Sequence, residues 1–288
     1  MAARARVVYQ GEPGAFAEEA ARTFFADPNV APVPTWRAVF EAVRDGVADA
    51  GAVPIENSLA GTIRENHDLL YEFHDDGLRI HGEVSVPVRL ALLALPGQRL
   101  EDIERVYSHP QALAQADAFL RTRPWQVMTT YNTAGAAKLI AEAGEQGGAA
   151  IAAPRVAEMY GLAILRDGVE TGKGDRTRFA ILATGALDAA WIAPGMAAGR
   201  PRTTIVFAVR NVPGSLHRSL GVFAERGLNL SRLESRPWVG RGTRWEYLFW
   251  VDLDGDPAEP AAADALDALR AETELVRVVG TYPRAAED

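Results

Sequence analysis

Residues 171–179, with the sequence TGKGDRTRF, contain the side chains best suited to chemistry. Gly172 and Gly174 predict a flexible loop, and the apolar run that starts at Phe179 predicts a buried strand. Between them stand Thr177, whose hydroxyl can donate a proton, and Arg178, whose planar fork can hold a carboxylate through two parallel hydrogen bonds. From these nine residues alone an ordinary solvated loop is the favoured interpretation, so their role depends on the rest of the chain.

Polar side chains also stand where several other predicted strands end. Glu56, Asn57 and Ser58 follow the apolar residues 51–55, residues 108–111 (SHPQ) follow a short strand, and Thr133 begins a helix. Ligands of open α/β sheets bind at the carboxyl ends of strands, so these positions predict a shared cleft if two lobes face one another. Two plainer interpretations stay open: Asn57 or Ser58 as a helix N-cap, and the glycine turn at residues 11–14 as a tight turn without an anion.

Composition excludes several classes of protein. The 288 residues carry a net charge of −8 and contain no cysteine. A nucleic-acid binder needs clustered cations, and thiolate chemistry and disulfides need cysteine. We see no signal peptide, no apolar run long enough for a membrane span, and no spacing typical of metal or cofactor sites. We therefore expect a cytoplasmic protein without metal or organic cofactor, acting on a small molecule and not on nucleic acid or membranes.

The elements that must position these residues alternate between strand and helix from residue 6 to residue 183. This order predicts an α/β region with both sheet faces covered. Within it, residues 84–95 predict strands that cross between two lobes, with Pro87 at an edge or bend. Residues 184–202 are rich in Ala, Gly and Pro and predict a linker. From residue 203 the order βαββαβ predicts a ferredoxin-like unit, which by itself carries no function.

Three motifs together resemble the prephenate dehydratases: residues 54–62 (PIENSLAGT), residues 108–112 (SHPQA) and the triplet Thr177-Arg178-Phe179. The segments NVPGSL at 211–216 and ESRP at 234–237 resemble the ACT regulatory domain of those enzymes. The resemblance implies a two-lobed catalytic region of the periplasmic-binding-protein type (1–183), a linker (184–202) and an ACT domain (203–288). It also implies conversion of prephenate to phenylpyruvate, feedback inhibition by L-phenylalanine, and a homodimer or homotetramer.

The resemblance also implies roles for particular residues. Thr177 is the expected acid for the departing hydroxyl, aided by Ser58 or Gln111, and Arg178 is the expected carboxylate anchor. The remaining substrate-binding residues are Asn57, Thr62, His109, Thr133 and Phe179, although Phe179 also suits the core. The expected phenylalanine pocket comprises Asn211, Pro213, Gly214, Ser215, Leu216, Asn229, Leu230, Glu234, Ser235 and Arg236.

The chain departs from the family pattern at three positions. Asp175 stands where Asn is common, Ala17 where Ser is common, and Ala116 where Cys is frequent. Only Asp175 affects the expected chemistry, because its negative charge close to a dianionic substrate would weaken binding. Two rivals remain: an arogenate dehydratase, whose substrate has an amine in place of the keto group, and a non-catalytic amino-acid sensor.

Overall fold

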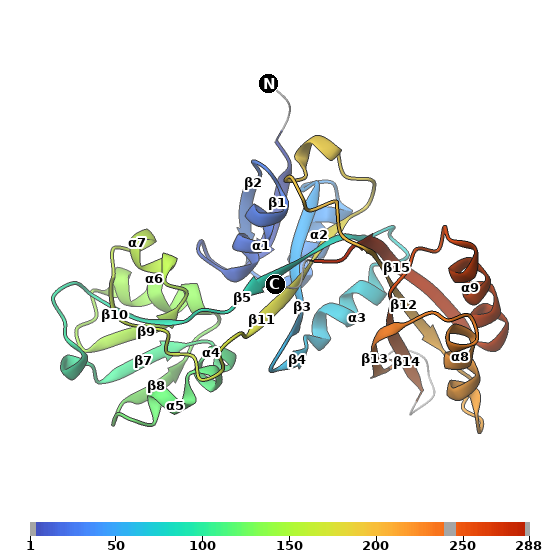
Figure 1. Cartoon of the computed structure of the whole chain (residues 1–288). Helices are drawn as coiled ribbons and strands as arrows, with labels where there is room; N and C mark the ends of the chain where they lie inside the picture. Colours follow the sequence, from blue (N-terminus) through green and yellow to red (C-terminus); the bar gives the residue numbers. More distant parts are fainter. Residues whose placement is uncertain (1–3, 239–245, 286–288) are drawn as a thin grey trace.

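The structure is a computed structural model that describes residues 4–238 and 246–285. It contains three bodies in a row (Figure 1). Lobe 1 lies in the middle, lobe 2 on one side of it, and the C-terminal domain on the other side. Each body is built around its own sheet, with six, five and four strands respectively. The two-lobed α/β region and the following βαββαβ unit predicted from the sequence are both confirmed.

Lobe 1 is built on a mixed sheet with the strand order β2-β1-β3-β11-β5, to which the short strand β4 adds at β3. Helices α2 and α3 contribute to the apolar cluster on one face, and α1 to the cluster on the other. The strands are β1 Arg6–Gln10, β2 Asn29–Val33, β3 Ala50–Asn57, β4 Gly61–Thr62, β5 Arg79–Pro87 and β11 Arg176–Ala183. The helices are α1 Phe16–Phe24, α2 Trp36–Arg44 and α3 Arg64–Glu72.

Lobe 2 has the strand order β10-β6-β9-β7-β8 and a core made largely of alanine, leucine, isoleucine and valine. Its strands are β6 Ala91–Ala94, β7 Arg105–Ser108, β8 Gln126–Thr129, β9 Gly148–Ala152 and β10 Ala163–Asp167. Its helices are α4 Pro110–Gln115, α5 Asp117–Leu120, α6 Thr133–Ala143 and α7 Arg155–Met159, with a 3-10 turn at Leu100–Asp102. The strands β2 and β8 were not expected from the sequence, because both are short and largely exposed.

Two chain crossings join the lobes, one from β5 to β6 and one from β10 to β11. The first is the crossing expected within residues 84–95, and Pro87 ends a strand at the sheet edge, as expected. The second corrects an expectation. Thr177 and Arg178 lie inside β11 and not in the loop before it. Because successive side chains of a strand point to opposite faces, these two neighbours face different parts of the molecule.

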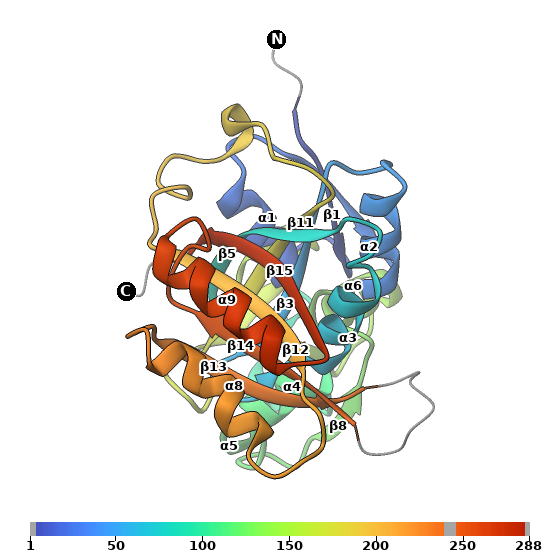
Figure 2. The same cartoon turned by 90° about the vertical axis from the view of Figure 1, so that its right-hand side faces the viewer.

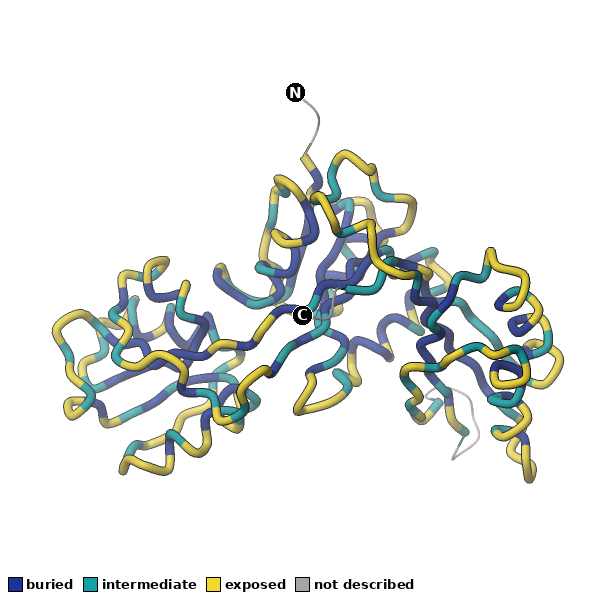
Figure 3. The backbone as a smooth tube through the Cα atoms, in the orientation of Figure 1, coloured by how far each residue is buried: buried dark blue, intermediate teal, exposed yellow. Residues whose placement is uncertain are grey.

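The C-terminal domain is an antiparallel sheet with the order β13-β14-β12-β15. Its elements are β12 Pro201–Ala208, α8 Ser215–Ala224, β13 Leu230–Pro237, β14 Tyr247–Leu253, α9 Pro260–Glu272 and β15 Leu275–Pro283. Helices α8 and α9 lie together on the outer face of the sheet (Figure 2). The inner face packs on lobe 1, where Trp250 and Tyr282 join a core cluster with Leu69 and Phe73. The buried backbone therefore continues from lobe 1 into this domain (Figure 3).

The segment between the two regions packs on lobe 1. It contains a 3-10 turn at Ala189–Trp191, and Ile192 forms an isolated bridge with Phe25. Leu187, Trp191, Ile192 and Met196 are partly buried against the core cluster around α1. The segment is thus held against the surface of lobe 1 before β12 begins.

Candidate active site

A cavity of about 410 Å³ lies between the two lobes. Lobe 1 and lobe 2 both contribute to its wall, so closing or opening the lobes would change its shape. Its lining residues are Gln10, Ala15, Phe16, Ala17, Pro34, Thr35, Trp36, Pro54, Ile63, Glu65, Val88, His109, Gln111, Ala112, Gln115, Tyr131, Asn132, Thr133, Thr177 and Phe179. Of the residues predicted from the sequence, it brings together Thr177, Phe179, His109, Gln111 and Thr133.

Thr177 is held in the cavity wall by the sheet and by Asn57. Strand β11 pairs with β3 on one side and β5 on the other, and Thr177 stands opposite Asn57 in the first pairing. The Asn57 amide donates a hydrogen bond of 3.1 Å to Thr177 Oγ1. Because the oxygen of Thr177 is already accepting, its own hydrogen is free to point at a ligand. A donor at this oxygen also stabilises the negative charge that builds up when Thr177 gives its proton away.

Asp175 is the centre of a hydrogen-bond network behind Thr177. It is only 3% exposed, and it accepts hydrogen bonds from Asn57 at 2.9 Å, Ser58 at 2.8 Å and Gln115 at 2.6 Å. All three partners donate, which suits a carboxylate and not the amide that is common at this position in the family. Gln115 belongs to lobe 2 and the other two to lobe 1, so Asp175 ties the lobes together close to the cavity.

His109 and Gln111 come from the start of α4 in lobe 2. The backbone N–H of Gln111 donates to His109 Nδ1 at 3.2 Å. A neutral imidazole that accepts at Nδ1 carries its hydrogen on Nε2. Burial lowers the pKa of His109 below its usual value. His109 therefore offers a neutral N–H donor to a ligand near neutral pH.

Two helix N-termini from different lobes open on the cavity. Ala15 and Phe16 begin α1 and Thr133 begins α6, and all three line the cavity wall. The N-terminus of a helix presents backbone N–H groups and a partial positive charge, which suits anions. No arginine or lysine is among the cavity-lining residues of the described chain. An anionic ligand here would be held mainly by neutral donors and helix ends.

Polar contacts close the lobes around the glycine turn of lobe 1. Lys138 and Tyr131 both reach Glu12, at 3.0 Å each, and Tyr160 donates to the carbonyl of Pro13 at 3.0 Å. Arg155 adds a hydrogen bond of 2.9 Å to the carbonyl of Gly14. The N–H of Gly14 is itself bound by Glu18 of α1, so this one N–H of the turn is not free for an anion.

Two residues expected to contact substrate lie outside the cavity lining in this structure. Arg178 does not line the cavity, because its side chain leaves the opposite face of β11 and pairs with Glu56 and Asp252. Thr62 also faces the C-terminal domain, where its hydroxyl hydrogen-bonds Glu234. Both expectations treated these residues as parts of loops whose side chains all face the cleft. They lie in strands, where successive side chains face opposite sides.

Two further side chains take different positions from those expected, and a third residue of the site was not expected at all. Asn57 and Ser58 do not cap α3, whose N-cap is Ile63 without a side-chain bond. Asn57 instead accepts from the N–H groups of Leu59 and Ala60, and Ser58 stands behind the cavity wall on Asp175. Gln115 was missed, although it follows Gln111 by four residues on the same helix, a spacing that places both on one face.

The residues expected to bind phenylalanine fall at two ends of one sheet. Leu230 pairs with Leu253, which pairs with Thr203, while Arg236 pairs with Leu248, which pairs with Ala208 at the other end of β12. The 211–216 turn follows Ala208, so it lies near Arg236 and about 20 Å along the strands from Leu230. Glu234 and Arg236 themselves contact Thr62 and Asp68 of lobe 1.

Residues 4–238 and 246–285 contain no group of three or more His, Asp or Glu side chains placed to hold a metal ion. In the same residues, none of the helices has the length and apolar character needed to traverse a bilayer.

Comparison with known proteins adds a family and several relatives. Residues 7–186 match the family described as prephenate dehydratase, and residues 203–271 match the ACT domain. Arogenate dehydratase 5 of Arabidopsis thaliana is 40% identical over 96% of the chain and 67% of its own length. Arogenate dehydratase 1 of Petunia hybrida is also 40% identical, over 96% of the chain and 66% of its own length. The chain thus spans about two thirds of the length of these plant relatives.

Solved structures agree in fold over almost the whole chain. Prephenate dehydratase from Arthrobacter aurescens in complex with L-Phe is 32% identical, with a TM-score of 0.81, covering 97% of this chain and 90% of that one. A structure described as GqqA, a novel type of quorum quenching acylases, is 36% identical, with a TM-score of 0.82 and 98% of both chains covered.

Proposed function

The chain belongs to the prephenate dehydratase family, and from that membership we propose that it converts prephenate to phenylpyruvate, water and carbon dioxide in phenylalanine biosynthesis. The observation that carries the proposal is the hydrogen bond from Asn57 to Thr177 in the wall of the interlobe cavity. It leaves the hydroxyl hydrogen of Thr177 available to a substrate bound in the cavity between the lobes.

The reaction needs a proton for the hydroxyl that leaves. When the ring carboxylate departs as carbon dioxide, its bonding electrons enter the ring, the ring hydroxyl departs, and the ring becomes aromatic. Thr177 donates the proton that turns this hydroxyl into water, and Asn57 stabilises the oxygen that Thr177 is left with. Positioned proton donation contributes about 10² to 10⁴ in rate. Exclusion of water by the closed lobes and correct orientation supply more, since a threonine hydroxyl is a weak acid in water.

The two carboxylates of the substrate match the two helix N-termini. We place one against the start of α1 in lobe 1 and the other against the start of α6 in lobe 2, where Thr133 adds a hydroxyl. His109 and Gln111 offer neutral donors to the keto group. This arrangement replaces Arg178 as the expected anchor, and it requires both lobes, so substrate binding would favour the closed form.

Arogenate is the alternative substrate, and the names of the plant relatives support it. Arogenate carries an ammonium group where prephenate has a keto group. Glu65 lines the cavity, and a carboxylate there would attract an ammonium and repel a dianion. We propose prephenate as the preferred substrate because the matching family and the Arthrobacter aurescens structure are both described as prephenate dehydratase.

Hydrolysis of an acyl group is a second candidate, because the GqqA structure is described as an acylase. The contacts at Thr177 speak against it. A hydroxyl nucleophile needs a base that takes its proton, whereas the partner of Thr177 is an amide that donates to it. We therefore treat release of an amine from an acylated amine as an outcome to be measured beside dehydration.

Incubation of the wild-type protein with prephenate and, separately, with arogenate tests the proposed function. We expect phenylpyruvate and carbon dioxide from prephenate, with kcat/KM at least tenfold above that for arogenate. A kcat/KM higher for arogenate than for prephenate would establish arogenate as the preferred substrate. No turnover of either substrate by folded protein would leave the amino-acid sensor or the acylase as the remaining functions.

Regulation by L-phenylalanine at the C-terminal domain is part of the proposal, supported by the ACT match and the L-Phe complex of the Arthrobacter aurescens protein. Since the two halves of the expected pocket lie at opposite ends of the sheet, we propose that a second chain, in a homodimer or homotetramer, brings them together. We also propose the division into residues 1–183, 184–202 and 203–288. Regulation, like catalysis, would take place in the cytoplasm.

Gly214→Val tests the position of the phenylalanine pocket. Gly214 has φ of 81° at the exposed turn before α8, and valine strains such backbone and fills the turn. We expect loss of phenylalanine inhibition, with turnover in its absence kept. Gly227→Val is the matched control, since Gly227 has φ of 66° just after the same helix. Normal inhibition of the Gly214 variant would show that the pocket lies elsewhere.

A further inference from the structure

Arg178 lies in a buried ionic cluster where lobe 1 meets the C-terminal domain. Its Nη2 is 2.9 Å from Glu56 and 2.8 Å from Asp252, and its Nη1 is 3.6 Å from Glu83. Glu83 is also bound by Arg202 of the C-terminal domain at 2.9 Å. The cluster therefore joins β3, β5 and β11 of lobe 1 to β12 and β14 of the C-terminal domain.

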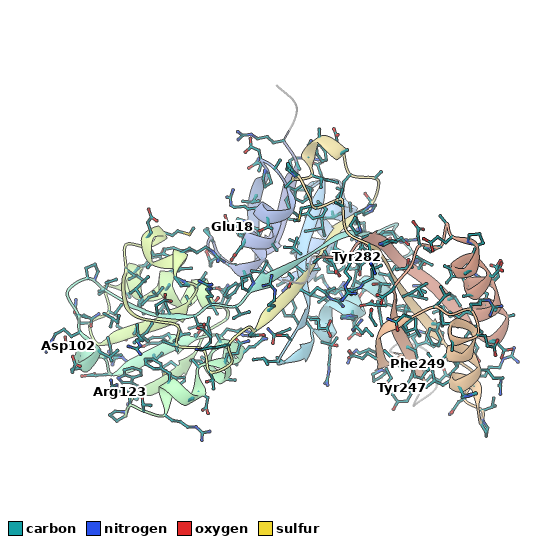
Figure 4. All side chains as sticks on the ribbon, in the orientation of Figure 1. Glu18, Asp102, Arg123, Tyr247, Phe249 and Tyr282 are labelled. Carbon is teal, nitrogen blue, oxygen red and sulfur yellow. The ribbon has the colours of Figure 1, made fainter. Side chains whose placement is uncertain are left out.

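Asp252 is held rigidly on the C-terminal side of this contact. It is 1% exposed, and Thr204 donates to its second oxygen at 2.8 Å. Thr204 in turn hydrogen-bonds the hydroxyl of Tyr282 at 2.7 Å, and Figure 4 shows Tyr282 where the C-terminal sheet reaches lobe 1. Burial would raise the pKa of Asp252, but Arg178 and its neighbours hold that pKa below its usual value. Asp252 is thus a charged partner for Arg178 whose position follows the C-terminal domain.

The pairing of β11 with β3 is interrupted by a β-bulge immediately after Arg178. The pairing with β3 shifts register between Arg178 and Phe179, at the point where the next β3 partner is Pro54. The shift leaves Ile55 of β3 without a partner on β11, whereas Arg178 itself pairs with Glu56 of β3 and Ser85 of β5. Arg178 is therefore fixed to the sheet of lobe 1 through its backbone and to the C-terminal domain through its side chain, one residue from Thr177.

From these contacts we propose that Arg178 is a positioning residue, through which the docking of the C-terminal domain sets the place of Thr177 in the cavity. Asp252 pairs with the guanidinium of Arg178 on one face of β11, and the side chain of Thr177 projects from the other face of the same strand. A shift of the C-terminal sheet that breaks the Arg178–Asp252 pair moves the hydroxyl without touching the substrate. Phenylalanine would act by favouring such a shift, and this part of the proposal rests on the proposed function.

A different role follows if the cluster only stabilises the fold. In that case, loss of one carboxylate lowers the melting temperature and leaves kcat unchanged in the protein that stays folded. A positioning role instead lowers kcat while KM stays the same, because substrate is held by residues that the cluster does not contact.

Asp252→Asn decides between these roles, since it removes the charge and keeps the shape. Asp254→Asn is the matched control: that carboxylate lies two residues further on, and its hydrogen-bond partners Asn229 and Ser231 are in its own domain. Steady-state kcat and KM are measured for wild type and both variants on whichever of prephenate or arogenate the wild type turns over. Phenylalanine binding is measured separately by calorimetry, and folding by circular dichroism.

We expect Asp252→Asn to lose at least fivefold in kcat, with KM within twofold of wild type. We also expect this variant to bind phenylalanine without any change in its remaining rate. A kcat within twofold of wild type overturns the proposal. If wild type neither binds phenylalanine nor responds to it, the proposed regulation fails, and kcat alone still decides the positioning role. Should Asp252→Asn not fold, Arg178→Lys is held to the same kcat and KM criteria, because it keeps the charge and loses the fork.

Discussion

Lobe 1 meets lobe 2 and the C-terminal domain through two contacts of opposite character. Toward lobe 2 it leaves a cavity of about 410 Å³ whose described lining has no arginine or lysine. Toward the C-terminal domain it buries Glu83 and Asp252 against Arg178 and Arg202. The first contact encloses a cavity, whereas the second is a buried ionic cluster, through which we propose that movement of the C-terminal domain reaches β11. Strand β11 serves both, with Thr177 on one face and Arg178 on the other.

The largest effect that would sharpen this comparison is expected on the cavity side, from Asn57→Asp. Aspartate keeps the oxygen that accepts from Leu59 and Ala60 but lacks the amide that donates to Thr177 and Asp175, and its charge repels the Asp175 carboxylate. Loss of one such donor costs about 10² to 10³ in kcat. The rate of product formation at saturating substrate measures it.

Asn29→Asp is the control for that experiment, because Asn29 is exposed at the start of β2 and the substitution adds the same charge. Its kcat should equal that of wild type. An Asn57→Asp variant that keeps more than a third of wild-type kcat would remove Asn57 from the chemistry and break the comparison on the cavity side.

A second effect concerns pH on the C-terminal side. Burial, with help from Arg232, lowers the pKa of His67 from 6.5 to about 3 in the folded protein. Below pH 6.5 His67 therefore binds a proton in the unfolded chain, whereas in the folded chain it stays neutral down to about pH 3. Stability falls with falling pH across that window, by about 1.4 kcal/mol per pH unit from this group.

Denaturant unfolding at several pH values checks this, with His67→Gln beside wild type. Glutamine cannot titrate, so the difference in unfolding free energy between the two proteins should narrow as the pH falls below 6.5. The exposed His217 provides the control, through a His217→Gln protein measured in the same series. Parallel curves for wild type and His67→Gln would show that His67 is protonated in the folded protein.

The smallest effect is expected at the contact that holds the lobes together. Gln115→Leu removes the lobe 2 donor to Asp175 and leaves the lobe 1 donors in place. We expect KM to rise about tenfold, corresponding to about 1.4 kcal/mol of closure, with kcat little changed. Gln126→Leu, on an exposed strand of the same lobe, should leave KM at the wild-type value. An unchanged KM for Gln115→Leu would mean that Asp175 does not act in closure.

Much of the fold was predictable because its signals are local. Apolar strands alternate with amphipathic helices, and Pro87 marks the end of a strand at the sheet edge, as the structure has it. Thr177 and Phe179 share a face because a strand has a period of two, and that periodicity was present in the residues. The glycines at 172 and 174 predicted a loop up to Phe179, so the strand was expected to begin later than Arg176, where it does begin. The shared face of Thr177 and Phe179 was therefore not recognised.

The contacts of Arg178, Thr62 and Asp175 could not be predicted in the same way. Arg178 and Asp252 are 74 residues apart, and Gln115 and Asp175 are 60 apart. Which charged residue meets which depends on how the three bodies pack, and no pattern within one segment records that. A carboxylate at position 175 was expected to repel substrate, but its oxygens are occupied by three donors.

Single-turnover kinetics of Thr177→Val and Thr177→Ser beside wild type test the division of β11 most directly. Valine keeps the shape and loses the hydroxyl, and serine keeps the hydroxyl. We expect the rate of the chemical step to fall about 10² to 10⁴ in Thr177→Val and to stay within about tenfold of wild type in Thr177→Ser, with substrate affinity unchanged in both. A Thr177→Val enzyme that forms product at the wild-type rate would show that the proton comes from another group and that the cavity face of β11 has been misassigned.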